Sequence, residues 1–235
     1  KNKFNATIRI PIGIVGLITP WNFPIAIPAW KIAPALICGN TIVFKPSSDT
    51  PMCAVELVKI IEKAGLPSGV LNLVTGSGTK VGNPKIKHPR IRGLSFTGSR
   101  DTGKFIRENA GLKKVNLELG SKNAIIIMED ANLDLALEGV LWGAFGTTGQ
   151  RCTAASRIIV HEKVFNKFQS MLVNKTRKLK LGDGLSKTTD LGPLINKSAL
   201  EKSYRYVDIG KNEGAKLLCG GEGVKGKGLF FKPTI

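Results

Sequence analysis

The sequence is short of acidic residues, with 17 Asp and Glu against 35 Lys and Arg, which leaves a formal net charge of +18. Such an excess can attract nucleic acid or anionic lipid. Aromatic residues, however, make up only 6% of the chain and do not alternate with basic residues as a groove for single-stranded nucleic acid requires. We therefore expect no nucleic-acid partner and interpret the scattered lysines as a solvated surface: Lys59, Lys63, Lys80, Lys85, Lys87, Lys175, Lys178 and Lys180.

Long apolar runs are also absent. No stretch of roughly 18 uncharged apolar residues occurs, so we expect neither a membrane span nor a membrane partner. Residues 1–10 are polar and strand-like, without the apolar centre of a signal peptide. The chain lacks an initiator Met and stops in mid-pattern at Pro233-Thr234-Ile235, which favours an excerpt of a longer protein.

The four cysteines form no Cys-x-x-Cys pair. Cys38, Cys53, Cys152 and Cys219 have no spacing typical of a zinc site or of a disulfide framework. We therefore expect no metal ion and a reducing, cytoplasmic setting.

Up to Gly120, short apolar runs alternate with helical stretches. Strands are expected at 12–18, 41–45, 70–74, 91–96 and 115–117, and helices at 24–37, 50–63, 101–109 and after the turn at 78–82. The strands are too apolar to be half-exposed. This α/β series predicts a doubly wound, Rossmann-like parallel sheet covered on both faces.

After Gly120 the pattern restarts. Strands are expected at 124–128 and 156–160, and helices at 133–145 and 164–179. A boundary near residues 120–122 would divide the chain into a first domain, 1–120, and part of a second α/β domain, 121–235.

Two glycine clusters follow predicted strands, where open parallel sheets bind their ligands. Gly76-Ser77-Gly78 lacks the Gly-Lys-Ser/Thr ending of a phosphate-binding Walker loop, and alone it is better interpreted as a turn. Gly98-Ser99, followed by Gly103, opens a helix whose N-terminal N–H groups could bind a phosphate. By spacing alone, a phosphate site and an unliganded turn are equally good interpretations of this second cluster.

Three segments occur in a distinctive order: Pro20-Trp21-Asn22-Phe23-Pro24, Leu117-Glu118-Leu119-Gly120 and Gly149-Gln150-Arg151-Cys152-Thr153. Together with Phe44-Lys45-Pro46-Ser47 and Phe96-Thr97-Gly98-Ser99, they resemble the signature of the aldehyde dehydrogenase superfamily over essentially the whole chain. The resemblance implies NAD(P)-dependent, non-phosphorylating oxidation of a small-molecule aldehyde to a carboxylic acid. It also implies a dinucleotide-binding domain at 1–120, a catalytic domain at 121–235, and a homodimer or homotetramer in which residues 1–11 form an oligomerisation hairpin.

By this resemblance Cys152 is the nucleophile, which forms a thiohemiacetal and then a thioester. A lone cysteine is more often a packing residue, but the neighbours of Cys152 are polar. Asn22 is assigned as the oxyanion donor together with the backbone N–H of Cys152; the alternative for Asn22 is a helix N-cap.

Glu118 matches the general base that activates water for thioester hydrolysis. Its leucine neighbours suggest a partly enclosed position, and the alternative is a solvated glutamate at a strand end. Lys31 matches a family lysine thought to assist proton relay, and the alternative is an exposed helical lysine.

The resemblance implies NADP or NAD as cofactor. Many NAD-preferring relatives carry a glutamate where Ser48 stands, and that carboxylate repels a 2′-phosphate. We therefore expect NADP to be accepted and NAD to remain usable, although Asp49 offers an alternative carboxylate. The cofactor-binding candidates are Trp21, Lys45, Ser48, Gly78, Gly98, Ser99, Gly103 and Leu119.

Arg151 precedes the nucleophile and could pair with an anionic group on the aldehyde; alternatively it turns away to a local acid. Ser121 departs from the glycine common in the family, and a downstream Glu-Ile-Phe-Gly-Pro-like segment is not in the sequence. Two rival functions remain. Glu118 disfavours a CoA-acylating relative, and intact Cys152, Glu118 and Asn22 disfavour a catalytically silent one.

Overall fold

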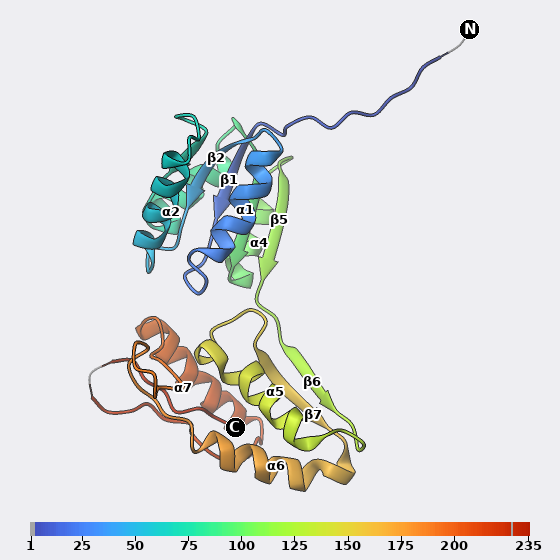
Figure 1. Ribbon diagram of the computed structural model, residues 1–235, viewed down its shortest axis with the longest axis vertical. Coiled ribbons are helices and arrows are strands. Elements are labelled where there is room, and N and C mark those ends of the chain that lie inside the picture. Colours follow the sequence, from blue (N-terminus) through green and yellow to red (C-terminus); the bar gives the residue numbers. More distant parts are fainter. Residues whose placement is uncertain (1–2, 227) are drawn as a thin grey trace. The chain divides into compact units, whose positions relative to one another are not determined.

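The computed structural model describes residues 3–226 and 228–235. It divides the chain into two compact units, Lys1–Gly120 and Ser121–Ile235, which are coloured blue to green and green to red in Figure 1.

The first unit is built on a five-stranded, fully parallel sheet in the order β3-β2-β1-β4-β5. The chain begins in the middle of the sheet at β1, proceeds outward through β2 to β3, and then crosses to β4 and β5 on the other side. This reversal of strand order creates a crevice at the carboxyl ends of β1 and β4, where ligands of such sheets bind. The strands are β1 (Ile14–Ile18), β2 (Thr41–Lys45), β3 (Leu71–Leu73), β4 (Ile91–Gly98) and β5 (Lys114–Leu119).

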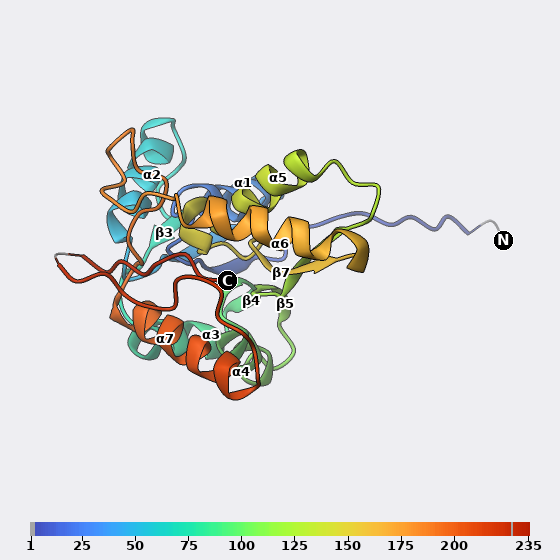
Figure 2. The ribbon, with the colours of Figure 1, turned by 90° about the horizontal axis from the view of Figure 1, so that it is seen from below.

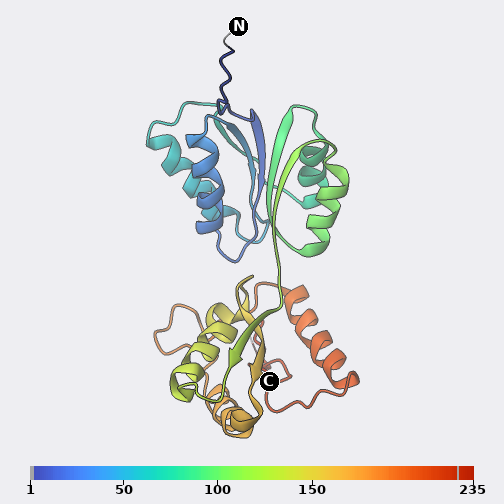
Figure 3. The ribbon, with the colours of Figure 1, turned by 90° about the vertical axis from the view of Figure 1, so that its right-hand side faces the viewer.

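Helices cover both faces of this sheet (Figure 3). One face packs against α1 (Ala26–Ile37) and α2 (Pro51–Lys63), and the other against α3 (Asn83–Lys87) and α4 (Arg100–Asn109). Successive side chains of a strand point to opposite faces, so Val15 and Leu17 join the first core while Ile14 and Ile18 pack against the second. The predicted doubly wound sheet is confirmed.

Local signals explain where some helices begin. Pro51 opens α2 at its first turn, and Gly65, with φ of 95°, follows its end, as predicted. The N-cap interpretation of Asn22 is wrong, because α1 starts only at Ala26 and its N-cap is Ile25, which makes no side-chain cap. A bend with Pro24 separates Asn22 from the helix. The turn predicted at 78–82 is a π-helical turn, η1 (Gly78–Gly82), leading into α3.

The second unit contains a two-stranded parallel sheet of β6 (Asn123–Ile127) and β7 (Ala155–Val160). Helices α5 (Leu133–Phe145) and α6 (Glu162–Thr176) cover one face, and their core includes Ile127, Val140 and Phe168. Helix α7 (Lys197–Asn212) lies on the opposite side of this sheet (Figures 2 and 3). The sequence analysis did not predict α7, which has no buried residue.

Residues 3–13 carry no helix or strand, so the described part of the predicted hairpin is not formed in the single chain; Lys1 and Asn2 lie outside the described residues. Its role in oligomerisation stays a prediction. Within the described parts of the chain, no helix is long and apolar enough to cross a membrane.

Candidate active site

The loops after β2 and β3 bring together predicted cofactor residues. Lys45 ends β2, is only 6% exposed, and donates from Nζ to the Pro46 carbonyl at 2.9 Å. Burial lowers the pKa of Lys45. The Ser48 hydroxyl donates to the Gly76 carbonyl at 3.2 Å and so ties the two loops together. A Cβ atom at Gly78 would meet no other atom within 4 Å, which leaves this position open.

The alternative carboxylate, Asp49, has a local partner. The Ser47 hydroxyl donates to Asp49 Oδ2 at 3.3 Å, and the Asp49 backbone N–H donates back to Ser47 Oγ at 3.2 Å. This short turn gives Asp49 a structural role at the start of α2.

The start of α4 holds the second glycine cluster. Ser99 is the N-cap, and its Oγ accepts a hydrogen bond from the Thr102 backbone N–H at 3.3 Å. A Cβ atom at Gly103 would lie 2.5 Å from Leu119 Cδ2, so only glycine lets α4 approach β5 this closely. Packing therefore accounts for Gly103 and Leu119, and direct cofactor contact by either stays a prediction. Gly98 is constrained in the same way, because a Cβ there would lie 2.4 Å from the Phe96 ring.

The segment between β1 and α1 contains Trp21 and Asn22, both half-buried. Asn22 Oδ1 accepts a hydrogen bond from the Phe23 backbone N–H at 3.1 Å, so the donor group of this amide is Nδ2. Just before them, the Thr19 hydroxyl is buried without a hydrogen-bond partner among the described residues. Unpartnered buried hydroxyls are rare, and this one lies at the crevice edge, where a water or ligand atom would complete its bonding.

Lys31 is not the exposed helical lysine of the alternative interpretation. It is half-buried, and its Nζ donates to Ser95 Oγ on β4 at 2.8 Å. Ser95 in turn donates to Asn116 Oδ1 on β5 at 3.2 Å. Burial lowers the pKa of Lys31, and the negative charge of Glu118 partly offsets that effect. The sheet therefore brings Lys31 close enough to Glu118 for their charges to interact.

Glu118 itself is exposed, whereas the sequence suggested an enclosed position. The reason is the two-residue period of a strand: Leu117 and Leu119 pack against the α4 core, so Glu118 between them points to the other face. The apolar neighbours of Glu118 therefore indicate the burial of Leu117 and Leu119 and do not indicate burial of Glu118.

Lys85, which the sequence placed on a solvated surface, is instead 5% exposed. Its Nζ donates to the carbonyls of Val43 at 2.9 Å and Leu17 at 3.2 Å. The Lys85 side chain passes close to Gly16 of β1, where a Cβ atom would lie 3.1 Å from Lys85 Cδ. Burial, and secondarily the charge of Lys45, lower the pKa of Lys85 to about 7.

This burial predicts a pH-dependent stability. Between about pH 7 and 10.5 the unfolded chain holds the Lys85 proton and the folded chain does not, so the free energy of unfolding rises with pH across that window. Below it, both states are protonated and the full desolvation cost remains. Lys85→Met should therefore raise the free energy of unfolding by roughly 4 kcal/mol at pH 6, and the gain should fade towards pH 10.

The measurement is urea unfolding of both proteins from pH 6 to pH 10. Lys87→Met is the matched control, because Lys87 lies on the same helix but is exposed. If the change in the free energy of unfolding caused by Lys85→Met were the same at every pH, burial of Lys85 would not disfavour its charged form, and the prediction would be wrong.

In the second unit, Cys152 follows a strained turn. Thr147 and Thr148 in η2 (Gly146–Gly149) have φ of 53° and 57°, and Gly149 has φ of 65°. Left-handed conformations cost roughly 1–2 kcal/mol for a residue with a Cβ, and they are unusual for β-branched side chains. Strain of this kind concentrates at functional sites. Cys152 is exposed, which excludes the buried packing role considered from the sequence.

Arg151 forms no ion pair with an acidic side chain within the described structure. Its Nη2 donates to the carbonyls of Trp142 at 2.6 Å and Gly143 at 3.0 Å, and its guanidinium carbon lies 5.0 Å from the centre of the Trp142 ring. It therefore satisfies carbonyl groups at the end of α5 rather than pairing with an acid. Substrate recognition by Arg151 stays a prediction.

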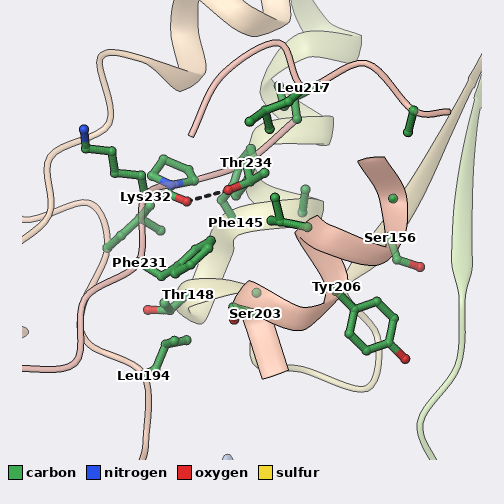
Figure 4. Close-up of a pocket in the computed structure, with 18 of the residues that line it drawn as sticks. Phe145, Thr148, Ser156, Leu194, Ser203, Tyr206, Leu217, Phe231, Lys232 and Thr234 are labelled. Atoms are coloured by element: carbon green, nitrogen blue, oxygen red, sulfur yellow. Dashed lines mark hydrogen bonds between the residues drawn. The ribbon is translucent and has the colours of Figure 1, made fainter. Parts of the chain in front are cut away.

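A cavity of about 620 Å³ also lies in the second unit (Figure 4). Its walls include Phe145 of α5, Leu194 and Phe231, and Thr148 and Gly149 of the strained turn also border it. Cys152 is not among its lining residues, so we do not assign the aldehyde to this cavity. Elsewhere in the described residues, no three His, Cys, Asp or Glu side chains are grouped as metal ligands would be.

Comparison with known proteins decides the family. The sequence model of the Aldehyde dehydrogenase family matches residues 1–235. The chain belongs to this family. Among its relatives, 2,5-dioxopentanoate dehydrogenase of Saccharolobus solfataricus is 46% identical over 97% of this chain and 48% of its own length. Retinaldehyde dehydrogenase 3 of Mus musculus is 47% identical over 96% of this chain and 44% of its own length.

Solved structures give the same result for this aldehyde dehydrogenase chain. Betaine aldehyde dehydrogenase from Staphylococcus aureus, crystallised in complex with NAD⁺, superimposes with a TM-score of 0.93 and 40% sequence identity, covering 95% of this chain and 46% of that one. The chain thus spans about half the length of the relatives that it matches.

Several polar residues around the aldehyde dehydrogenase motifs were not predicted. Ser95 accepts from Lys31 and donates to Asn116, and Lys85 donates to the Leu17 carbonyl of β1. Asn123 donates to the Cys152 carbonyl, and Gln150 donates to the Pro193 carbonyl. Gln150 stands within the motif Gly149-Gln150-Arg151-Cys152-Thr153, and that place was the signal that could have found it.

Proposed function

We propose that this chain carries the cofactor-binding and nucleophile-bearing parts of an NAD(P)-dependent enzyme that oxidises an aldehyde to a carboxylic acid. The observation that carries the proposal is Cys152, an exposed thiol directly after a strained turn in a chain of the aldehyde dehydrogenase family. Exposure gives an aldehyde access to the sulfur, and a thiolate is the strongest nucleophile that a protein side chain offers at neutral pH.

In the proposed reaction, the Cys152 thiolate adds to the aldehyde carbonyl and forms a thiohemiacetal. The carbonyl oxygen becomes an oxyanion, which accepts hydrogen bonds from Asn22 Nδ2 and from the Cys152 backbone N–H. A nicotinamide cofactor, when present, would supply the acceptor for the hydride of the same carbon, and loss of that hydride would leave a thioester on Cys152. Glu118 then removes a proton from water as the oxygen adds to the thioester carbon. The carbon–sulfur bond breaks, the acid leaves, and the thiolate returns.

Lys31 is proposed as the group that carries protons away from Glu118. Its charge interacts with Glu118, and its contact with Ser95 fixes its ammonium group on the sheet. A lysine whose pKa is lowered by burial releases a proton more easily than an exposed lysine does.

The residues at the crevice fit a dinucleotide. Ser99 caps α4, whose N-terminal N–H groups suit a pyrophosphate, and Lys45 supplies a cation beside the proposed ribose position. Thr19 presents a buried hydroxyl that lacks a partner, and Gly78 leaves open space. A relative crystallised with NAD⁺ supports NAD or NADP as the cofactor.

We further propose an aldehyde that carries a carboxylate. Two relatives, at 46% and 44% identity, are named for 2,5-dioxopentanoate and for alpha-ketoglutaric semialdehyde, which are two names of one aldehyde that carries a carboxylate. Arg151 is the nearest cation to Cys152 along the chain, although its Nη2 binds the end of α5 in this structure.

The proposal is tested by a substrate screen on the full-length protein. Aldehydes with and without a carboxylate are offered with NAD⁺ or NADP⁺, and the reduced nicotinamide is followed by absorbance. We expect the acid as product, the highest kcat/KM for anionic aldehydes, and no dependence on CoA. Formation of an acyl-CoA would instead favour the acylating relative, and no reduction with any aldehyde would favour a silent one.

A separate prediction concerns the choice of cofactor. Ser48 is exposed and uncharged, so nothing at this position repels a 2′-phosphate. Ser48→Glu should add that repulsion and shift the ratio of kcat/KM for NAD⁺ over NADP⁺ towards NAD⁺ by about tenfold, which corresponds to about 1.4 kcal/mol. The measurement is kcat/KM for both cofactors with one aldehyde.

Ser48→Gln is the matched control, because it adds nearly the same bulk without the charge. Its ratio should move by less than that of Ser48→Glu. A strong preference for NAD⁺ in the unmodified enzyme, or equal shifts in both variants, would refute the role given to Ser48.

The setting of the enzyme follows from the same proposal. All four cysteines are free thiols, in keeping with a reducing cytoplasm. Residues 3–13 expose Phe4, Ile8 and Ile10, a set of apolar side chains suited to contact with a second copy in a homodimer or homotetramer.

A further inference from the structure

Cys152 lies in a short stretch of backbone with little regular structure of its own. After the strained turn, residues 150–154 lie outside the helices and strands, and two turn hydrogen bonds join their backbone, from Gln150 N–H to the Thr147 carbonyl at 3.1 Å and from Ala154 N–H to the Arg151 carbonyl at 3.2 Å. We call residues 147–154 the nucleophile segment. Such a segment needs hydrogen bonds to other parts of the chain, because two local hydrogen bonds do not offset the conformational free energy of two threonines in the left-handed region.

One anchor comes from β6. Asn123 Nδ2 donates to the Cys152 carbonyl at 2.7 Å and to the Ala154 carbonyl at 3.2 Å. Asn123 stands where the register of β6 and β7 shifts, between Asn123 and Ala124, so the side-chain amide supplies bonds where the strand ladder is interrupted. The bond to the Cys152 carbonyl fixes the peptide plane that follows the nucleophile.

The other anchor is Gln150. Its Nε2 donates to the Pro193 carbonyl at 3.3 Å, and its Oε1 accepts from the Ile195 N–H at 3.1 Å. This pair of bonds has the form of a strand pairing in which a side chain replaces one backbone. The Thr148 hydroxyl adds a bond to the Gly192 carbonyl at 3.3 Å, so the segment is tied to residues 192–195 at two points.

We propose that Asn123 and Gln150 are positioning residues, whose amides hold the nucleophile segment before and after the Cys152 Cα atom and thereby set the orientation of the Cys152 sulfur and backbone N–H. The inference rests on the proposed function of Cys152. Both amides bond to, or extend from, the backbone of the segment, Asn123 at the Cys152 and Ala154 carbonyls and Gln150 towards residues 193–195, so each acts through that backbone. A misplacement of about 1 Å can reduce a reaction rate by a factor of a hundred, so anchors of this kind affect turnover without touching the substrate.

The experiment compares Asn123→Leu and Gln150→Met, which keep similar bulk but lose the amide bonds, with the unmodified full-length protein. Amide hydrogen exchange, read by mass spectrometry on peptides covering 147–155 and 192–196, reports the order of the segment. Steady-state kinetics report kcat and the KM of the cofactor. We expect exchange at least tenfold faster in these peptides, kcat at least tenfold lower, and a cofactor KM within twofold of the unmodified value.

Two further variants separate positioning from general stability. Asn132→Ala removes the N-cap of α5, where Asn132 Oδ1 accepts from the N–H groups of Asp134 and Leu135 at 3.1 Å each. It should cost about 1 kcal/mol of stability while leaving both readouts unchanged. Gln150→Glu keeps the acceptor towards Ile195, so it should restore part of the exchange protection and part of kcat.

Unchanged exchange in Asn123→Leu and Gln150→Met would overturn the inference, and so would faster exchange with kcat within twofold of the unmodified value. The failure of the proposed function would look different. In that case the unmodified protein would reduce no cofactor with any aldehyde, while the exchange measurement would still decide whether the two amides hold the segment.

Discussion

Cys152→Ala should abolish aldehyde oxidation, lowering kcat by roughly 10⁴-fold or more. Without the sulfur no thiohemiacetal forms, and a free or hydrated aldehyde surrenders a hydride poorly. The side chain is exposed and makes no core contact, so the substitution should leave the fold intact. The measurement is reduced-nicotinamide formation under saturating aldehyde and cofactor, together with circular dichroism to confirm folding.

Cys38→Ala is the matched control. Cys38 is also an exposed free thiol, but it lies at the end of α1 in the first unit, so its loss should change kcat by less than twofold. Residual turnover of Cys152→Ala above a few per cent would mean that the hydride leaves without covalent catalysis. A large loss in Cys38→Ala would point to a second functional thiol.

Glu118→Gln should separate the two halves of the reaction. If Glu118 activates the water, its amide variant still forms the thioester but hydrolyses it slowly. Rapid mixing should then show a burst of about one reduced nicotinamide per active site, followed by a steady rate lowered by roughly 10²- to 10⁴-fold. Stopped-flow absorbance measures both phases in one experiment.

Glu108→Gln supplies the comparison, because Glu108 is an exposed glutamate on α4 whose only charged partner within the described residues, Lys104, lies 3.9 Å away. It should behave as the unmodified enzyme. If burst and steady rate fell together in Glu118→Gln, Glu118 would be acting before the thioester forms, and its assignment as the hydrolytic base would be wrong.

Much of the first unit could be predicted because its pattern is local. The alternation of apolar strands with helices, and punctuation such as Pro51 and Gly65, place the elements within a few residues of their bounds. These signals act within one turn of helix or one strand, so a single sequence contains them. Helix α7 was missed although Asn196 caps its start, and its side chains are all at least partly exposed.

Candidate site residues could be proposed only where a motif contains them. Cys152, Glu118 and Asn22 were proposed in this way, and their roles stay predictions; their surroundings could not be predicted, since contacts between distant residues are set by the fold. Asn123 meets Cys152 across 29 positions, and Gln150 meets Pro193 across 43. Burial of single charged residues escaped prediction for the same reason. The sequence around Lys85 does not distinguish it from an exposed lysine, and only the folded structure shows that it is buried.

The fit of α4 on β5 has a consequence for how variants of this enzyme are interpreted. Gly103 touches no proposed reactant, yet its missing side chain determines how closely the helix lies against Leu119, next to Glu118. A larger residue would clash with the Leu119 side chain, which is one residue away from Glu118 and would have to move. In a survey of random mutations, Gly103 would therefore be scored as intolerant, together with the proposed catalytic residues. The positions of this protein that do not tolerate substitution would therefore include packing residues such as Gly103 as well as residues that take part in the proposed reaction.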